Sequence, residues 1–471
     1  MNNKNRDSID FGTMSIPRLF VKLFVPTLLG LIFSALLNIV DGVVVGHGVG
    51  SDALAAVNIA APIFLLSSSV SLMFATGVSI VASVHLSHGN SKAANINVTQ
   101  ALTVPLIPLA LLSVAMLFGA RQLGFIFGGS EALSPYVEDY LHWLTLFPLL
   151  QLVMVTGSFV MRLDGSPKLA MCVNMVPAVL NSALDVIFVF PLHWGIMGAA
   201  FATSISAGVG AAMVAAYLLF FSKNIHLYRP KFTRTSLYLT MRNIGYMAKL
   251  GFPTFVGEGA ISCMMIAGNY MFMAMLHEDG VAAFSVCCYT FPLVFMFGNA
   301  IAQSQLPIVS YNYGLGDTGR IRTAFHFAVR LTAVLGTAMV LFGVFCCRPL
   351  ITLFLDPATN AFRIAVEGFP LFSLSFVFFS LNVVLIGFWQ SVERAKEAVA
   401  FMLLRGVVVL LPAFLLLPRA IGVSGLWLAV PLSEAVTFVV IAAITFKRLN
   451  LITRPRAKAT TTNPQTPAHD E

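Results

Sequence analysis

The sequence predicts an all-α membrane protein, with twelve transmembrane helices arranged as two parallel-repeat six-helix lobes around a central cavity. Three observations support this fold class: an apolar composition, long segments without charge and an internal repeat. Of the 471 residues, 58% are apolar, only 10% are charged, and the mean hydropathy is +0.86. Soluble domains carry about 25% charged residues, so this composition indicates a chain that resides in a bilayer.

The uncharged segments are long enough to cross a membrane. Residues 53–91, 93–120, 186–222, 280–316 and 368–392 contain no Asp, Glu, Lys or Arg. Each segment exceeds the roughly 20 residues that a helix needs to span the hydrocarbon core. Membrane crossings must be helices or closed barrels, because unpaired backbone groups are not tolerated in lipid. Continuous apolar runs without alternation exclude a barrel.

Polar breaks between the apolar runs define the expected helices. In chain order we expect crossings at about 17–40, 57–84, 95–118, 138–161, 168–190, 198–221, 243–275, 281–304, 324–346, 366–390, 397–417 and 423–446. The first run is too long for a cleavable signal, so we expect it to remain as the first helix. Six cysteines without CxxC spacing, and histidines without paired spacing, indicate no metal site.

The basic residues predict the orientation. If the N-terminus is cytoplasmic, 23 of the 28 Lys and Arg residues lie in segments on that side and four lie on the other. This asymmetry follows the positive-inside rule, so we expect a multi-pass protein of the plasma membrane with both termini in the cytoplasm. The rule accounts for the net charge of +8 and leaves no basic surface for nucleic acid.

An internal repeat relates the two halves of the chain. At an offset of 227 residues, KLFVPTLLG at 22–30 matches KLGFPTFVG at 249–257, and Pro191 and Gly195 match Pro418 and Gly422. Six helices is an even number, so both copies have the same orientation, which predicts a pseudo-twofold axis along the membrane normal. We therefore expect a cytoplasmic N-terminus at 1–15, an N-lobe at 16–221, a cytoplasmic linker at 222–241, a C-lobe at 242–447 and a disordered cytoplasmic tail at 448–471.

Two acids interrupt the apolar segments of the first half. Asp41 stands in LLNIVDGVVVG and Asp185 in NSALDVIFVF, and an ionisable side chain at mid-membrane is costly enough to indicate a function. Asn38 and Asn181 lie three and four residues before these acids on the same helix faces, and Thr203 begins a hydroxyl-rich helix. Their oxygens suit a proton, which burial and like-charge repulsion favour, or Na⁺ at Asp41 and Asp185. The alternative is interhelical hydrogen bonding alone.

The second half has a different polar set, which we expect to line a C-lobe cavity. It consists of Glu258, Arg405 and Glu434. Arg405 can neutralise either glutamate as a structural pair or take part in transport, and both interpretations stay open. Pro26 and Pro253 lie in the first helix of each lobe and are candidate hinges, because each frees a backbone carbonyl and permits bending. Their alternative role is packing.

Several segments resemble the multidrug and toxic compound extrusion (MATE) family, particularly its bacterial members. They are NIVDGVVVGHGVGSDALAAVNIAAPI, SQLPIVSYNYGLGD, RLDGSPK and NSALDVIFVFPLHWGIMGAAFAT, and the resemblance runs from about residue 16 to 447. The resemblance implies an antiporter of the bacterial inner membrane, which exports amphipathic, often cationic compounds in exchange for H⁺ or Na⁺. It implies a cation site at Asp41, Asn181, Asp185 and Thr203. The second half lacks the helix-10 acid of some members, which favours the N-lobe pair for coupling.

Other functional classes are less compatible with the sequence. A flippase of lipid-linked precursors or an exporter of polysaccharides would favour Arg and Lys in its cavity, and the helices offer only Arg405. A major facilitator would carry a Gly, Asp and Arg run after its second helix, where HLSHGNSKAANIN stands. No Walker loop, HExxH or GxSxG motif indicates an enzyme, and a membrane scaffold remains a further alternative. The complete duplicated cavity predicts a monomer that needs no cofactor beyond its coupling ion.

Overall fold

The protein is helical throughout the residues that its computed structural model describes, which are 9–49, 51–127, 131, 133–229 and 233–452. No strand occurs in these ranges. Among the described residues, eleven helices are long and apolar enough to cross a membrane. Ser134–Trp143 and Phe147–Leu163, bent by 49° relative to each other, give a twelfth if the pair forms one span. The predicted all-α membrane fold is confirmed.

The N-lobe contains eight α-helices and one π-helical turn. They are α1 (Ile16–Gly48), α2 (Ser51–Ser87), α3 (Ser91–Thr103), α4 (Leu106–Ile126), α5 (Ser134–Trp143), α6 (Phe147–Leu163), α7 (Pro167–Val189), α8 (Gly195–Ala216) and the turn η1 (Tyr217–Phe221). The crossing expected at 95–118 is divided into α3 and α4. Pro105 stands at this break, where a proline has no N–H to continue the helix.

The C-lobe likewise consists of eight α-helices and one π-helical turn among the described residues. It comprises α9 (Arg234–Leu315), α10 (Thr318–Phe345), α11 (Cys347–Thr352), α12 (Asn360–Ser373), α13 (Ser375–Ser391), α14 (Ala395–Leu403), the π-helical turn η2 (Leu404–Val408), α15 (Leu410–Ile421) and α16 (Val423–Ile452). Two predicted crossings form the single element α9, kinked at His277, which has a φ of 53°. The tail expected from residue 448 is helical up to Ile452, and its remainder lies outside the described residues.

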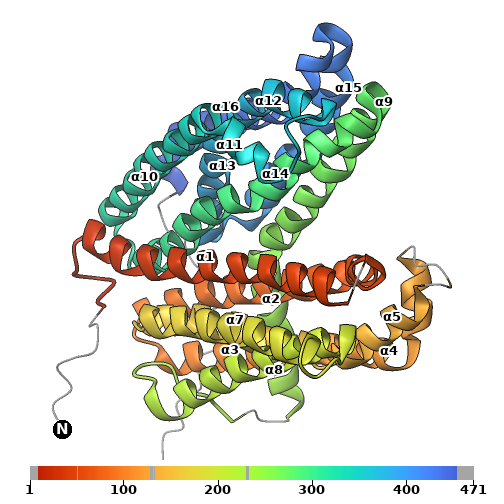
Figure 1. Cartoon of the computed structure of the whole chain (residues 1–471). Coiled ribbons are helices and arrows are strands. Elements are labelled where there is room, and N and C mark those ends of the chain that lie inside the picture. Colours follow the sequence, from red (N-terminus) through yellow and green to blue (C-terminus); the bar gives the residue numbers. More distant parts are fainter. Residues whose placement is uncertain (1–8, 50, 128–130, 132, 230–232, 453–471) are drawn as a thin grey trace, which may run out of the picture.

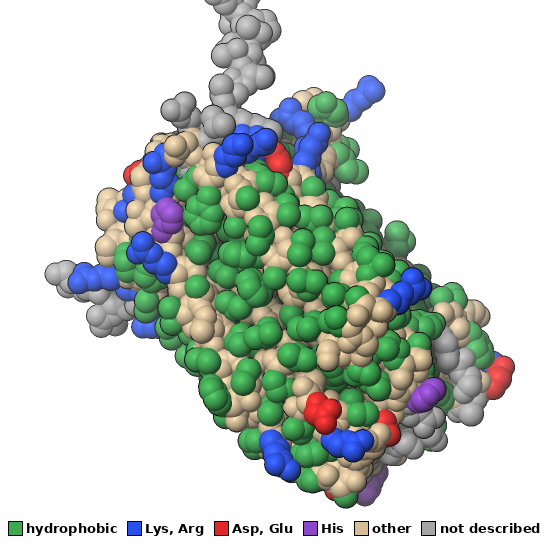
Figure 2. Space-filling model, turned by 90° about the horizontal axis from the view of Figure 1, so that it is seen from above, with side chains coloured by type: hydrophobic (Ala, Val, Ile, Leu, Met, Phe, Trp, Pro, Cys, Tyr) green, Lys and Arg blue, Asp and Glu red, His purple; other side chains and the backbone are tan. Residues whose placement is uncertain are grey.

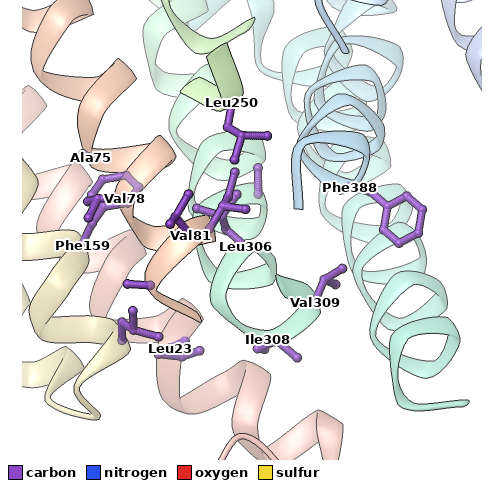
Figure 3. Close-up of a cluster of buried hydrophobic side chains, with 14 of the residues drawn as sticks. Leu23, Ala75, Val78, Val81, Phe159, Leu250, Leu306, Ile308, Val309 and Phe388 are labelled. Atoms are coloured by element: carbon purple, nitrogen blue, oxygen red, sulfur yellow. The ribbon is translucent and has the colours of Figure 1, made fainter. Parts of the chain in front are cut away.

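The lobes share one hydrophobic core at one end of the bundle and have separate cores at the other. The shared core takes residues from both lobes, including Leu23, Val78 and Phe159 with Leu306 and Phe388 (Figure 3). Its members include the first turns of α1, from Ile16 to Phe24, and residues in the second half of α2, from Ala75 to Ala82. We call this the closed end. At the opposite, open end the lobes have separate cores and diverge (Figure 1).

Helices α2 and α9 cross without space for side chains at the closed end. A Cβ atom at Gly77 would collide with the backbone carbonyl of Met247, and one at Gly251 would collide with that of Met73. This reciprocal contact brings the two backbones together across the boundary between the lobes. Thr76 and Thr254, which lie next to this crossing, have their hydroxyl oxygens 3.5 Å apart.

The surface agrees with residence in a bilayer. Figure 2 shows a broad band of hydrophobic side chains, with Lys and Arg gathered toward the ends of the molecule. Large apolar side chains that face outward include Leu111, Phe118, Phe345 and Val439. In water, a contiguous apolar surface of this extent would cause aggregation, whereas lipid tails cover it.

Candidate functional site

The two N-lobe acids face each other from adjacent helices. Asp41 is on α1 and Asp185 on α7, two helices that pack together along the lobe. Their carboxyl groups are close enough to interact through a hydrogen bond. Two carboxyl groups make that bond only when one of them carries a proton, because ionised carboxylates are acceptors only. A hydrogen bond between Asp41 and Asp185 therefore requires that one of the two be protonated.

Ionisation is more costly for Asp185 than for Asp41, because the Asp185 side chain is more deeply buried. Its side chain is fully buried, with 0% exposure, whereas Asp41 is half-buried. If both acids are ionised, neither carboxylate oxygen of Asp185 has a hydrogen-bond partner within the described residues. An unpartnered buried charge is expensive, so ionisation of Asp185 is disfavoured in these surroundings.

A second contact brings α7 and α8 together one turn from Asp185. The Asn181 side-chain amide donates a hydrogen bond from Nδ2 to the Thr203 hydroxyl, 3.3 Å away. Thr203 in turn donates to the carbonyl oxygen of Ala199 at 3.0 Å, so its hydroxyl orientation is fixed. Since the amide donates through nitrogen, its oxygen remains as an acceptor for a cation or a donor. Asn38 lies on α1, and its side chain is outside the described part of the structure.

Sequence reasoning missed one polar neighbour of the acids. Tyr140 on α5 is buried and lies within electrostatic range of both Asp41 and Asp185. Its hydroxyl is the type of group that donates to an ionised carboxylate. No sequence signal marked it, because Tyr140 lies near the start of the crossing expected at 138–161 and looks like one more interfacial aromatic residue.

The C-lobe polar residues divide into an ion pair and an isolated acid. Arg405, on the π-helical turn η2, donates from Nε to Glu434 of α16 at distances of 2.8 and 3.1 Å to its two oxygens. Glu434 also accepts from Nδ2 of Asn382 at 2.7 Å. Arg405 and Glu434 are 5% and 4% exposed, so this is a buried pair. Of the two glutamates open to Arg405 on sequence grounds, the structure pairs it with Glu434.

Glu258 lies instead at a cavity between the lobes. The cavity has a volume of about 60 Å³, and its lining includes Thr76 of the N-lobe together with Glu258, Gln390 and Arg405. Within the described residues, the Glu258 carboxylate has no hydrogen bond or ion pair. Glu434 lines a smaller neighbouring cavity of about 10 Å³, which Arg405 also borders.

The two candidate hinge prolines lie inside unbroken helices. Helix α1 continues through Pro26, and α9 continues through Pro253, with its one non-helical residue at His277. Helices α1 and α7, which carry the acids, each have a proline in their first turn, Pro17 and Pro167, where the missing N–H costs no hydrogen bond. The hinge roles of Pro26 and Pro253 remain a prediction.

The same family model matches the chain twice. The MatE model covers residues 26–187 and again residues 253–415. The chain belongs to the MatE family. The two matches begin 227 residues apart, which is the offset of the internal repeat. As a member of the MatE family, the protein is a membrane transporter.

Relatives in sequence extend over almost the whole MatE chain. A protein named FAD transporter, from Shewanella oneidensis, is 26% identical over 435 residues, covering 90% of this chain and 93% of its own length. Multidrug export protein MepA of Staphylococcus saprophyticus is 21% identical over 428 residues, covering 88% and 89%. Both relatives span the two lobes.

The fold is shared with solved structures of the family. The outward-facing conformation of a multidrug resistance MATE family transporter of the MOP superfamily has a TM-score of 0.86 at 19% identity. It covers 93% of this chain and 97% of its own. This likeness establishes that both lobes of the MatE chain, and their mutual arrangement, follow a known transporter fold.

Proposed function

We propose that the protein is a secondary active antiporter, which exports amphipathic, often cationic drugs or toxins in exchange for H⁺ or Na⁺. The observation that carries this proposal is the Asp41–Asp185 pair. Asp185 is fully buried, and its ionised carboxylate has no partner in the described residues, so the site is stable only when a proton or cation is present. Coupling requires a site of this kind, whose charge depends on an imported ion.

The polar residues of the N-lobe would act in successive steps of a transport cycle. A proton or Na⁺ arriving from outside neutralises Asp41 and Asp185, with Asn181 and Thr203 offering amide and hydroxyl oxygens. Neutralisation lets α1 pack differently, bending near Pro26, and the altered N-lobe surface releases the substrate. Return of the transporter discharges the ion inside. The ion and the substrate must prefer different conformations, since equal preference shifts no equilibrium.

The distribution of charge supports an orientation with the closed end in the cytoplasm. The segments at that end hold most of the Lys and Arg residues, including Lys92, Lys168 and Arg394. The conformation described above then faces outward, and both termini are cytoplasmic. We further propose a bacterial inner-membrane location, a monomer and no cofactor, because the cavity and the paired acids are complete within one chain.

The proposed substrate class is based on the chemistry of the cavity and on the names of the relatives. The cavity has apolar lining residues and an unpartnered carboxylate at Glu258, which suits an amphipathic cation. One relative is named FAD transporter, and others are named multidrug export proteins. Neither the family match nor these relatives favour a lipid-precursor flippase.

Gradient-driven dye uptake into inside-out vesicles tests the proposal. Ethidium uptake would be followed for the wild type and Asp41→Asn, first with an imposed proton gradient and then with a sodium gradient. We expect uptake with one gradient, which names the ion, and loss of that uptake in Asp41→Asn at normal protein levels. Asp139→Asn, an exposed acid on α5, is the matched control. Uptake that ignores both gradients contradicts the antiporter.

A further inference from the structure

We propose that the segment before α1, residues 9–14, is a latch that joins the two lobes at the closed end and must separate from the C-lobe before that end opens. We call residues 9–14 the latch. The inference goes beyond the proposed function, because it concerns how the lobes are held together and applies whichever substrate or ion is carried. In Figure 1 the latch, drawn in red, lies beside the start of α10 and leads directly into α1.

The latch is bound to the C-lobe through its backbone and through one aromatic ring. Arg320, in the first turn of α10, donates hydrogen bonds from Nη2 to the carbonyl oxygens of Phe11 and Met14, at 2.9 and 2.8 Å. Asn312 of α9 donates from Nδ2 to the same Phe11 carbonyl at 3.2 Å, and its side-chain oxygen accepts from Nε of Arg320 at 2.9 Å. The Phe11 ring is 6% exposed and lies against Tyr311, with the ring centroids 5.7 Å apart. This combination of charge-assisted hydrogen bonds and a buried ring makes the attachment specific.

The latch also contacts the N-lobe, two residues before Phe11. Ile9 lies against Gly165, which stands in the turn between α6 and α7. A Cβ atom at Gly165 would be 3.6 Å from Cβ of Ile9 and 3.8 Å from its carbonyl oxygen. Gly165 has a φ of 82°, a left-handed conformation that favours glycine, so this turn presents bare backbone to Ile9. The latch therefore touches both lobes within a few residues of chain.

Helix α1, which follows the latch, connects the same two lobes. Its body packs along α7 of the N-lobe, where Gly30 lies against Met171 and Asn174. Its first turns instead pack on the C-lobe, where the rings of Phe20 and Phe327 have centroids 5.1 Å apart. If α1 stays with α7 when the lobes part at the closed end, the latch is drawn away from α9 and α10.

The attachment of the latch to the C-lobe is easier to break than the packing of α1 on α7. The hydrogen bonds of Arg320 end on carbonyl groups of a turn whose Asp10 and Thr13 are exposed, so water can replace the lost partners. The contacts between α1 and α7 lie within apolar spans, where lipid offers no such replacement. Exposing the Phe11 ring is then the main cost of release.

Distances between spin labels at both ends of the molecule test the latch. Lys92 on α3 and Lys396 on α14 are exposed and report the closed end. Asp139 on α5 and Arg348 on α11 are exposed and report the open end, beside the separate cores of the two lobes. Each pair is labelled in lipid nanodiscs, without substrate or gradient, in a background whose native cysteines are replaced. Failure of the proposed export function would leave this measurement unaffected.

Four forms of the protein are compared: the wild type, Phe11→Ala, Arg320→Met and the double variant. Each single variant should raise the ratio of long to short closed-end distances at least about tenfold, the effect of losing one charge-assisted hydrogen bond or one buried ring. The open-end distance should shorten in the same proportion of molecules. Because both residues act on one contact, the double variant should shift the ratio by less than the product of the single effects.

Two matched controls should give wild-type distances. Arg330→Met removes an exposed arginine from the same helix, and Phe345→Ala removes an exposed ring at its other end. Unchanged ratios in both Phe11→Ala and Arg320→Met overturn the latch. A longer closed-end distance without a shorter open-end distance also overturns it, because that result indicates loosened packing alone.

A conservative substitution decides if Arg320→Met does not fold. Arg320→Lys keeps the positive charge, but lysine lacks the planar group that holds two carbonyl oxygens and the Asn312 side chain together. We expect the same shift toward long closed-end distances in this variant, smaller than in Phe11→Ala. Wild-type distances in Arg320→Lys, together with wild-type distances in Phe11→Ala, contradict the proposal.

Discussion

Arg162 of α6 donates a hydrogen bond from Nη1 to Oε1 of Gln303 in α9, 2.8 Å away, and thereby joins the two lobes at the closed end. The guanidinium is 5% exposed and stacks on Phe159, with its Cζ 4.6 Å from the ring centroid. Within the described residues no carboxylate pairs with it. If the closed end is cytoplasmic, as proposed, inward opening must break this contact, because the lobes would part at that end.

Arg162→Met should shift the protein toward a conformation with the closed end apart. Losing the guanidinium leaves the Gln303 acceptor without its donor, a cost of about 1–3 kcal/mol for the closed conformation. Spin labels at Lys92 on α3 and Arg322 on α10, both exposed, would report the separation of the lobes. Arg121→Met is the control, since Arg121 makes an exposed surface ion pair with Glu131. An unchanged distance distribution in Arg162→Met contradicts this role.

Gly251→Ala should destabilise the protein, because its new methyl group would meet the backbone of Met73 and force α9 away from α2. Overpacking of this kind costs about 1–3 kcal/mol. Gly245, in the same helix, has open space around the equivalent position, so Gly245→Ala should be neutral or slightly stabilising. Thermal unfolding in detergent measures both variants, and a Gly251→Ala transition equal to that of Gly245→Ala would refute the close crossing.

Tyr140→Phe tests the hydroxyl group that the structure places near both acids. If the Tyr140 hydroxyl donates to the acids in their ionised form, the variant removes a charge-assisted hydrogen bond, and gradient-driven ethidium export should slow by at least about tenfold. Ethidium binding in the absence of a gradient should not change. Tyr136→Phe, on an exposed position of the same helix, provides the control. Equal export by the two variants would remove Tyr140 from the site.

The Asp10 carboxylate organises the turn that precedes α1. It accepts hydrogen bonds from the Thr13 hydroxyl at 2.6 Å and from the backbone N–H groups of Gly12 and Thr13 at 2.8 and 3.2 Å. The Thr13 hydroxyl, then the Gly12 amide and, to a smaller extent, the charge of Arg320 hold the pKa of Asp10 below its usual value. Arg320 also donates to the carbonyl oxygens of Phe11 and Met14, which fastens this turn to the C-lobe.

This lowered pKa predicts a pH-dependent effect of Asp10→Asn. The ionised carboxylate stabilises the turn above the unfolded-state pKa of about 3.9, and that stabilisation is lost as pH falls through the lower folded-state value. At pH 7 the Gly12 amide should therefore exchange faster with solvent in the variant than in the wild type. As pH falls through the lowered folded-state pKa of Asp10, the ratio of the two rates should approach one. A ratio that stays constant with pH contradicts the assignment.

The sequence was sufficient to predict the fold class because apolar runs, charge asymmetry and the repeat are all properties of single segments or of the whole chain. Contacts between residues on different helices were harder to predict from the sequence. The sequence made Asp41 and Asp185 candidates because both interrupt apolar runs and share a helix face with polar residues, and their coupling role stays a prediction. The choice between Glu258 and Glu434 for Arg405 depends on how α16 packs on η2. Tyr140 and Asn382 became visible only when distant helices were placed together, because neither residue interrupts an apolar run in an unusual way.

The most direct test of the account is the release of ions by purified protein when a substrate binds. Ethidium would be added to the protein in weak buffer, with released H⁺ and Na⁺ recorded by indicator dyes and ethidium binding recorded by its fluorescence. If Asp41 and Asp185 hold the coupling ion, the wild type and Asp139→Asn should release one of these ions on binding. Asp185→Asn should bind ethidium and release neither. Release from Asp185→Asn equal to that of wild type would contradict the central claim.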